Sequence, residues 1–314
     1  HHPCVVQARR DAHQPPARRD HGRALSACLF LALSAPQSAI GALPAALRPM
    51  AYVTPSGSVS LVHADGRTTT LGDGWAPRLT ADKKQLVMMT EPPGPGGEKD
   101  RRVVLVDVDS GRRRTVVRGL VANPGISPDG SFVSVARYQE RGWELWVYPA
   151  AGGEGRRLSE YDGISPEWSP DSTGLFWADI DGLAQIALDG RTIDTVGLRD
   201  LLQNKAEFGW SDRFVPHPRR PGVFLISSSV AATSGSRDDL GLREAVMVAD
   251  LNAKSLTVIS PADLHASEAM WAPGGETVVF TGRASLGAEP ALFLVPAQGG
   301  IAPVRLVPGS GASF

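Results

Sequence analysis

Four carboxylates are the residues of this chain whose type and placement could support chemistry. Asp162, Glu167, Asp212 and Glu268 each lie near the start of a short apolar segment that is predicted to be a strand. If those strands surround a common axis, the four carboxylates could converge on a central channel. Oxygen ligands gathered in this way could hold Ca²⁺, because hard divalent cations prefer carboxylate oxygens. The alternative is that each carboxylate lies on a solvated loop.

Other motifs that could carry chemistry are incomplete. The segment 125–130 contains Gly, Ser and Gly, but their spacing is wrong for a nucleophile elbow. The glycines of residues 94–97 are not followed by the Lys-Ser/Thr pair of a phosphate-binding loop. After residue 50 only three histidines remain, and none has a partner at zinc-ligand spacing: His63, His217 and His265. The only cysteines, Cys4 and Cys28, precede residue 50, which excludes a disulfide or thiolate metal site in the body of the protein.

Composition and charge restrict the class of protein. The chain has 32 Lys+Arg and 33 Asp+Glu among 314 residues, and the net charge of -1 disfavours nucleic-acid binding. The one local basic cluster, Arg112–Arg114, is expected at a solvated strand edge. The 34 glycines and 25 prolines are spread along the chain, which predicts frequent turns and many short strands.

From residue 50 onward the same arrangement of segments recurs six times. Each copy has two β-favouring runs separated by residues that tolerate the positive φ angles of a tight hairpin. The copies are residues 59–71, 103–117, 145–158, 185–193, 246–259 and 292–301. Their turn residues are 37 to 47 residues apart, except for an interval of 63 between the fourth and fifth copies. This period predicts one four-stranded propeller blade per copy.

A second hairpin precedes most copies and begins with a recurring turn. In Ser127-Pro128-Asp129-Gly130 the proline fixes φ, the aspartate caps the turn locally and the glycine accepts the left-handed conformation. Related turns at 169–172 and 272–275 are directly preceded by Trp168 and Trp271. We predict that both rings are buried between neighbouring blades. Each would stabilise the fold by several kcal/mol, at roughly 25 cal/mol per Å² over about 200 Å².

The repeat predicts an all-β fold, a six-bladed β-propeller of four-stranded antiparallel blades over residues 50–314. A closed ring of blades leaves few sheet edges exposed to pairing with other chains. The first blade has one strand, residues 50–53, before its hairpin and no recognisable innermost strand. We expect this blade to be incomplete unless the tail, residues 307–314, supplies the missing strand.

The Trp-Ser-Pro-Asp sequence at residues 168–171, followed by an apolar strand and a hairpin, resembles the WD40-like, PD40-type repeat of TolB-like β-propellers. The resemblance extends over residues 50–308 through the related turns. Such propellers serve as periplasmic interaction scaffolds, peptidase gates and occasionally enzymes. TolB also carries an α/β domain ahead of its propeller. Because the signal-like segment ends near residue 42 and blade one begins near residue 50, we expect no such domain between them. The resemblance therefore implies a TolB-like propeller that differs from TolB.

The N-terminal part of the chain predicts export. Basic residues within 18–23 precede a short run of apolar and small residues at 24–35, and small residues follow at 39–41. These are the parts of a secretory signal peptide, and the run is too short to span a bilayer comfortably. The alternatives are a helix packed on the domain or an uncleaved tether. We expect residues 1–49 to be signal-like or disordered, and the protein to be periplasmic or secreted.

The leading functional hypothesis is an exported, non-catalytic propeller that binds a protein or a cell-envelope component through one face. We expect no cofactor, no nucleic acid, no transmembrane span beyond the N-terminal signal or tether, and a monomer. The alternative is a metal-dependent hydrolase or lyase of the six-bladed lactonase type, with Ca²⁺ held by the channel carboxylates. Two excursions, a short helix at 198–206 and a loop at 227–243, widen the repeat and are expected to help in gripping a partner.

Overall fold

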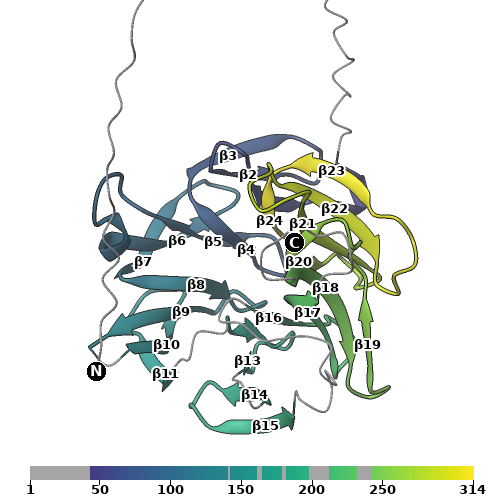
Figure 1. Ribbon diagram of the computed structural model, residues 1–314. Coiled ribbons are helices and arrows are strands. Elements are labelled where there is room, and N and C mark those ends of the chain that lie inside the picture. Colours follow the sequence, from purple (N-terminus) through teal and green to yellow (C-terminus); the bar gives the residue numbers. More distant parts are fainter. Residues whose placement is uncertain (1–42, 141, 161–164, 179–181, 198–211, 232–241) are drawn as a thin grey trace, which may run out of the picture. The chain divides into compact units, whose positions relative to one another are not determined.

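The computed structural model describes residues 43–140, 142–160, 165–178, 182–197, 212–231 and 242–314 (Figure 1). The described strands form six sheets of four antiparallel strands, arranged as a propeller, and this confirms the predicted fold. The segment predicted to direct export, Asp162 and the predicted helix at 198–206 lie outside the described residues. Within the described residues, no helix has the length and apolar composition needed to cross a membrane.

The strands of each blade follow one another from the inside of the ring outward. Blade one contains β24 (Ser310–Ser313), β1 (Met50–Val53), β2 (Ser58–Val62) and β3 (Thr68–Asp73). Blade two contains β4 (Trp75–Leu79), β5 (Gln85–Thr90), β6 (Arg101–Asp107) and β7 (Arg113–Gly119). Blade three contains β8 (Val121–Ile126), β9 (Phe132–Gln139), β10 (Gly142–Pro149) and β11 (Arg156–Glu160).

The other three blades repeat this order. Blade four contains β12 (Glu167–Trp168), β13 (Gly174–Ala178), β14 (Gly182–Ala187) and β15 (Thr192–Gly197). Blade five contains β16 (Arg213–Pro216), β17 (Val223–Ala231), β18 (Leu242–Asp250) and β19 (Ser255–Val258). Blade six contains β20 (His265–Trp271), β21 (Thr277–Arg283), β22 (Ala291–Pro296) and β23 (Val304–Pro308). Two short 3-10 helices, η1 (Ala45–Leu47) and η2 (Gly97–Asp100), accompany them.

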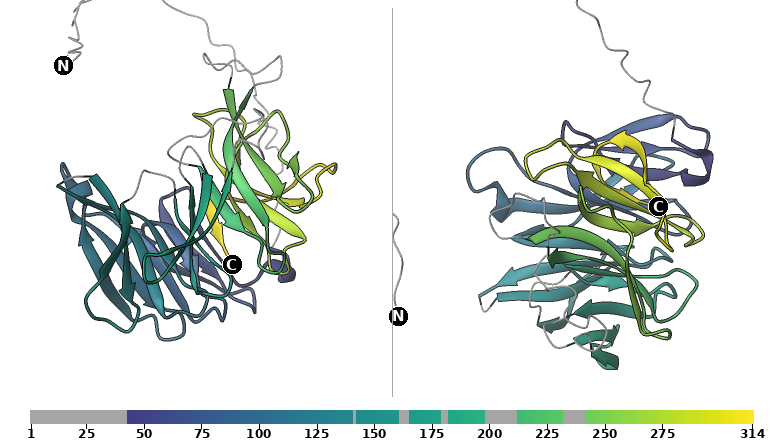
Figure 2. Two further views of the ribbon diagram at one scale, coloured as in Figure 1. Left: turned by 90° about the horizontal axis from the view of Figure 1, so that it is seen from below. Right: turned by 45° about the vertical axis from the view of Figure 1, so that its right-hand side comes forward.

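The first blade is completed by the C-terminal strand. β24 pairs antiparallel with β1, with Ala51 opposite Ser313 and Val53 opposite Ser310. Both views of Figure 2 show the yellow C-terminal segment against the purple strands of blade one. The backbone N–H of Leu79 in blade two also donates to Ser313 Oγ at 2.9 Å. The tail therefore supplies the innermost strand that the first copy of the repeat lacks.

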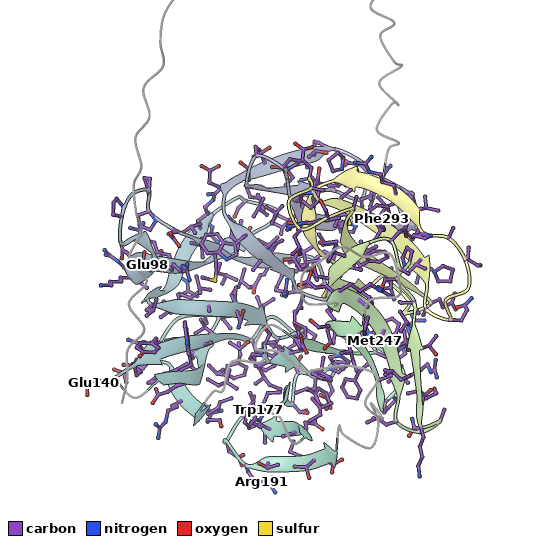
Figure 3. The ribbon with its side chains drawn as sticks, viewed as in Figure 1. Glu98, Glu140, Trp177, Arg191, Met247 and Phe293 are labelled. Carbon is purple, nitrogen blue, oxygen red and sulfur yellow. The ribbon has the colours of Figure 1, made fainter. Side chains whose placement is uncertain are left out.

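Side chains between neighbouring sheets form the core (Figure 3). Trp168 belongs to an apolar cluster made mainly by blade three, and Trp271 belongs to one that it shares with blade five. Each indole N–H reaches back to the preceding blade: Trp168 Nε1 donates to Ser134 Oγ at 2.9 Å, and Trp271 Nε1 donates to the carbonyl of Val215 at 3.1 Å. These contacts confirm that both rings are buried between blades.

The recurring turns join the first and second strands of blades two to six, at residues 80–84, 127–131, 169–173, 217–222 and 272–276. In the turn of blade three, Ser127 Oγ donates to Asp129 Oδ1 at 2.6 Å and accepts the N–H of Phe132 at 2.9 Å. The hydroxyl of Ser127 also lowers the pKa of Asp129. Gly130 has a φ of 75°, as the turn pattern predicts.

The two ends of the propeller carry different connections, because neighbouring strands of a blade are antiparallel. The recurring turns lie at one end, which we call the turn face. The connections between second and third strands lie at the opposite face. The predicted loop at 227–243 is partly strand, because β17 extends to Ala231 and pairs there with Leu242 of β18; residues 232–241 lie outside the described residues. Pairing with the apolar β18 overrides the weak strand propensity of the serines at 227–229.

Candidate functional site in the central channel

Three innermost strands contain a bulge with a strained residue. Ala76 in β4, Asn123 in β8 and Glu268 in β20 have φ values of 51°, 51° and 50°. The pairing register shifts at each of these positions. Left-handed backbone is unfavourable for residues other than glycine, and bulges redirect the side chains of a strand. All three residues line one cavity of about 200 Å³, so the strain is concentrated around the channel.

An ion pair crosses this cavity between blades four and five. Arg213 Nε in β16 donates to Glu167 Oε1 in β12 at 2.7 Å, and Arg213 Nη2 donates to the same oxygen. The two side chains are only 10% and 13% exposed. An isolated bridge between Ser165 and Arg213 joins the backbones beside them. The pair is therefore a largely desolvated polar contact between two blades.

The carboxylate of Glu268 has different partners. Thr281 Oγ1 in β21 donates to Glu268 Oε2 at 2.9 Å, and the N–H of Gly311 in β24 donates to Thr281 Oγ1 at 3.0 Å. This chain of hydrogen bonds runs from the channel carboxylate to the strand that closes the ring. Glu268 therefore links blade six to blade one.

Arg78 in β4 is the second arginine of the channel, and it has few partners. In the described part of the chain, its only side-chain hydrogen bond runs from Nη1 to the carbonyl of the neighbouring Pro77, at 2.8 Å. Burial, together with the charge of Arg213, lowers the pKa of Arg78 to about 10. Glu167 and Glu268 act in the opposite direction without offsetting these effects. The guanidinium remains protonated at neutral pH.

The structure brings together two of the four carboxylates named from the sequence. Glu167 and Glu268 both line the channel cavity. Asp212 does not line it; this buried residue precedes β16 and accepts a hydrogen bond from Ser228 Oγ at 2.6 Å. Asp162 lies outside the described residues. No group of three or more His, Cys, Asp or Glu side chains in the described residues could hold a metal ion. Calcium binding stays a prediction.

A second cavity, of about 370 Å³, forms the mouth of the channel at the turn face. It shares Arg78 and Glu167 with the first cavity, so the two meet at these side chains. Trp168, Met270 and Trp271 contribute to its apolar wall. Prolines from four recurring turns also line it: Pro128, Pro170, Pro218 and Pro273. We call this cavity the mouth cavity.

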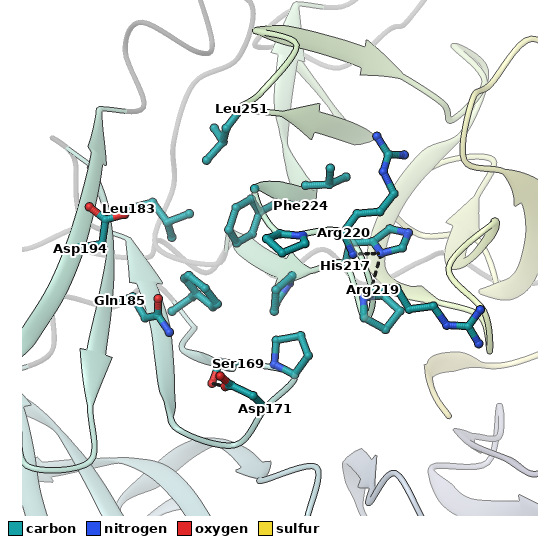
Figure 4. A pocket seen from close by; sticks show the side chains of 17 residues that line it. Ser169, Asp171, Leu183, Gln185, Asp194, His217, Arg219, Arg220, Phe224 and Leu251 are labelled. Atoms are coloured by element: carbon teal, nitrogen blue, oxygen red, sulfur yellow. Dashed lines mark hydrogen bonds between the residues drawn. The ribbon is translucent and has the colours of Figure 1, made fainter.

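A third cavity, of about 430 Å³, lies between blades four and five (Figure 4). Phe176 of blade four and Phe224 of blade five meet edge to face in its wall, with ring centroids 5.1 Å apart. His217 Nδ1 accepts the backbone N–H groups of Arg219 and Arg220 at 3.0 and 2.9 Å. His217 is therefore a turn residue, and burial lowers its pKa.

Sequence reasoning missed both channel arginines. The repeat marks where an innermost strand lies, but the bulges at residues 76 and 268 decide which of its side chains face the channel. The available signal was an arginine a few residues before each of two recurring turns, at residues 78 and 213. On the innermost strand of a blade, a charged side chain is expected to face the central channel.

Comparisons with known proteins agree with this architecture. The sequence matches no protein-family model and no curated protein. Among solved structures, TolB from Acinetobacter baumannii is similar with a TM-score of 0.63 and 16% identity, over 86% of this chain and 67% of that one. A putative TolB from Agrobacterium tumefaciens is similar with a TM-score of 0.56 and 16% identity, over 83% of this chain and 90% of that one.

A solved structure that is not a TolB protein is also similar to this chain. Hydrazine synthase from Kuenenia stuttgartiensis is similar with a TM-score of 0.50 and 16% identity, over 76% of this chain and 70% of that one. At such identities a structural likeness indicates the fold and not the activity. The chain has the fold of a TolB-like six-bladed β-propeller.

Proposed function

We propose that this protein is an extracytoplasmic binding scaffold that holds a protein or cell-envelope component against its turn face. The observation that carries the proposal is the mouth cavity, an apolar concavity of about 370 Å³ to which five blades contribute turn residues. Binding sites are commonly concave and mostly apolar, with a few polar groups that orient the ligand. The extracytoplasmic location rests on the signal-like segment at residues 18–35.

The prolines at the mouth favour association with a partner. Pro170, Pro218 and Pro273 are exposed. Proline has no N–H to desolvate, and its fixed φ leaves little backbone freedom to lose on binding. A rim of rigid apolar rings therefore presents a preformed surface to a partner.

The experiment that tests the proposal places a photo-crosslinking amino acid at Pro218. The matched control places the same amino acid at Pro95, an exposed proline in the connection between β5 and β6 on the opposite face. We expect irradiation of envelope fractions to give one specific adduct from position 218, identified by mass spectrometry, and none from position 95. The substitution Pro170→Arg should reduce its yield. Adducts from position 95 alone, or equal adducts from both positions, would count against the turn face.

The metal-dependent hydrolase or lyase has no comparable support in the described residues. Glu167 already accepts two hydrogen bonds from Arg213, and Glu268 accepts one from Thr281. A cation would have to displace these partners before it could use the carboxylates. Elemental analysis of the purified protein, with Glu268→Ala as the variant, tests this alternative directly. A stoichiometric calcium ion that is lost in the variant would favour the enzyme.

A further inference from the structure

We propose that Arg78 binds the carboxylate of a small organic acid whose apolar body occupies the mouth cavity. This inference goes beyond the scaffold function, because it concerns a small-molecule ligand and does not depend on a partner at the turn face. Arg78 lies where the two channel cavities meet, so its guanidinium is accessible to a ligand that enters through the mouth.

The first step concerns which charges of the channel are already engaged. Arg213 uses Nε and Nη2 to bind Glu167. Glu268 accepts the hydroxyl of Thr281. A guanidinium has five N–H donors, and in the described residues the Arg78 side chain donates one, to the carbonyl of Pro77. Arg78 therefore retains donors and charge for a further anion.

The second step concerns the charge of the ligand. The ionisable side chains that line the mouth cavity are Arg78, Lys83 and Glu167. Glu167 is paired with Arg213, and the carboxylate of Phe314, which also lines the cavity, offsets one of the two remaining cations, so a net positive charge is left for a ligand. Glu167 and Glu268 nevertheless remain close enough to oppose a dianion such as phosphate. A monoanion with two coplanar oxygens matches one guanidinium, and this describes a carboxylate.

The third step concerns the rest of the ligand. The mouth cavity is lined by Trp168, Met270, Trp271 and the turn prolines. A volume of about 370 Å³ suits a small molecule, and these walls favour an aromatic or branched aliphatic body. A carboxylate on Arg78 would place that body against the two tryptophans.

The fourth step concerns the cost of keeping Arg78. Arg78 is half-buried, and in the described residues its side chain has one hydrogen bond and no ion pair; burial also lowers its pKa. A partly desolvated cation without an ion-pair partner is destabilising, and an apolar side chain of similar size is often tolerated better. Residues that reduce stability in this way are expected at functional sites. The substitution Arg78→Met should therefore raise the thermal unfolding midpoint while removing the ligand site.

The experiment measures binding of 3-phenylpropionate and of its neutral isostere, 3-phenylpropionamide, by calorimetry or ligand-detected NMR. For so small a probe we expect a dissociation constant of about 1–10 mM for the acid. The amide should bind at least about tenfold more weakly, and Arg78→Met should lose the preference for the acid. Arg78→Lys keeps the positive charge without the planar guanidinium and should retain part of the preference for the acid.

The matched control is Arg112→Met, the same substitution at an exposed arginine of blade two. It should leave binding and the unfolding midpoint unchanged. Equal binding of acid and amide by the unmodified protein, or no binding of the acid, would overturn the proposal. So would a lower midpoint in Arg78→Met, because it would assign Arg78 a structural role. A further probe is a capped pentapeptide that ends in a phenylalanine carboxylate. If this peptide binds over tenfold more tightly than 3-phenylpropionate, the proposal is overturned and the site is assigned to the C-terminal ends of polypeptides.

Discussion

The seam between blades three and four and the seam between blades four and five are built from different interactions. At the first seam, Trp168 packs on blade three and donates to Ser134, and the N–H of Asp129 donates to Ser172 Oγ at 3.1 Å. At the second seam, the position directly before the turn is occupied by Pro216, which has no indole ring to pack on the preceding blade and no side-chain N–H to donate to it. Among the described residues, no hydrogen bond joins the turns of blades four and five.

The seam between blades five and six repeats the first arrangement. Trp271 donates to Val215, and the ring of His217 bonds the carbonyl of Gly275 through Nε2 at 3.1 Å. A tryptophan before the turn and a hydrogen bond between turns thus close both seams that flank the one between blades four and five. The seam between blades four and five relies instead on the Glu167–Arg213 ion pair and on apolar contacts beside a cavity. The seam between blades four and five is therefore held by an ion pair, whereas each of the two neighbouring seams is held by a buried tryptophan.

The largest expected effect comes from breaking that ion pair. Glu167→Ala leaves the charge of Arg213 buried without its partner and should lower the free energy of unfolding by about 3–5 kcal/mol. Urea unfolding measures the loss. The double variant Glu167→Met/Arg213→Met removes both charges and should recover most of it. If the double variant is as unstable as the single one, the seam depends on packing rather than on charge.

A smaller effect is expected at the seam closed by Trp168. Ser134→Ala removes the acceptor of the buried indole N–H and should lower the free energy of unfolding by about 1–3 kcal/mol. The matched control, Ser255→Ala, changes an exposed serine at the start of β19 and should stay within about 0.5 kcal/mol of the unmodified protein. Equal losses in the two variants would contradict a role for the indole hydrogen bond.

The smallest effect concerns pH at the seam between blades five and six. Burial lowers the pKa of His217, so at mildly acidic pH the unfolded chain binds a proton more readily than the folded protein does. Stability should therefore be fully present above the unfolded pKa of about 6.5 and should decline as the pH falls below it. His217→Ser, which installs the residue found in blades three and four, should flatten this dependence in urea unfolding between pH 7.5 and 5.5. A slope that persists in the variant would assign the effect to another group.

The sequence predicts the blades well because their signals are local. A Pro-Asp-Gly turn, a β-branched run and a tryptophan before the turn each act within a few residues, as at 127–130 and 168. Closure by β24 is also foreseeable, because the first copy lacks one strand and the tail is the one segment left over. These features need no knowledge of distant contacts.

The channel is harder to predict because its geometry depends on non-local contacts. Glu167 and Asp212 look alike in sequence, yet one lines the cavity and the other is bonded to Ser228 of the next strand. Glu167 lies within the innermost strand β12, whereas Asp212 precedes β16, and the sequence does not mark where these short strands begin. The partnership of Glu167 with Arg213, 46 positions away, likewise becomes visible only in the folded ring.

Closure by the strand Ser310–Ser313 also affects how the molecule is made. During synthesis β1 precedes its partner β24 by five blades, so its inner edge stays unpaired until β24 has been made. An unpaired strand edge invites pairing with other chains. The chain therefore carries an exposed strand edge at β1 until β24 docks, and loss of residues 310–313 would leave the ring open.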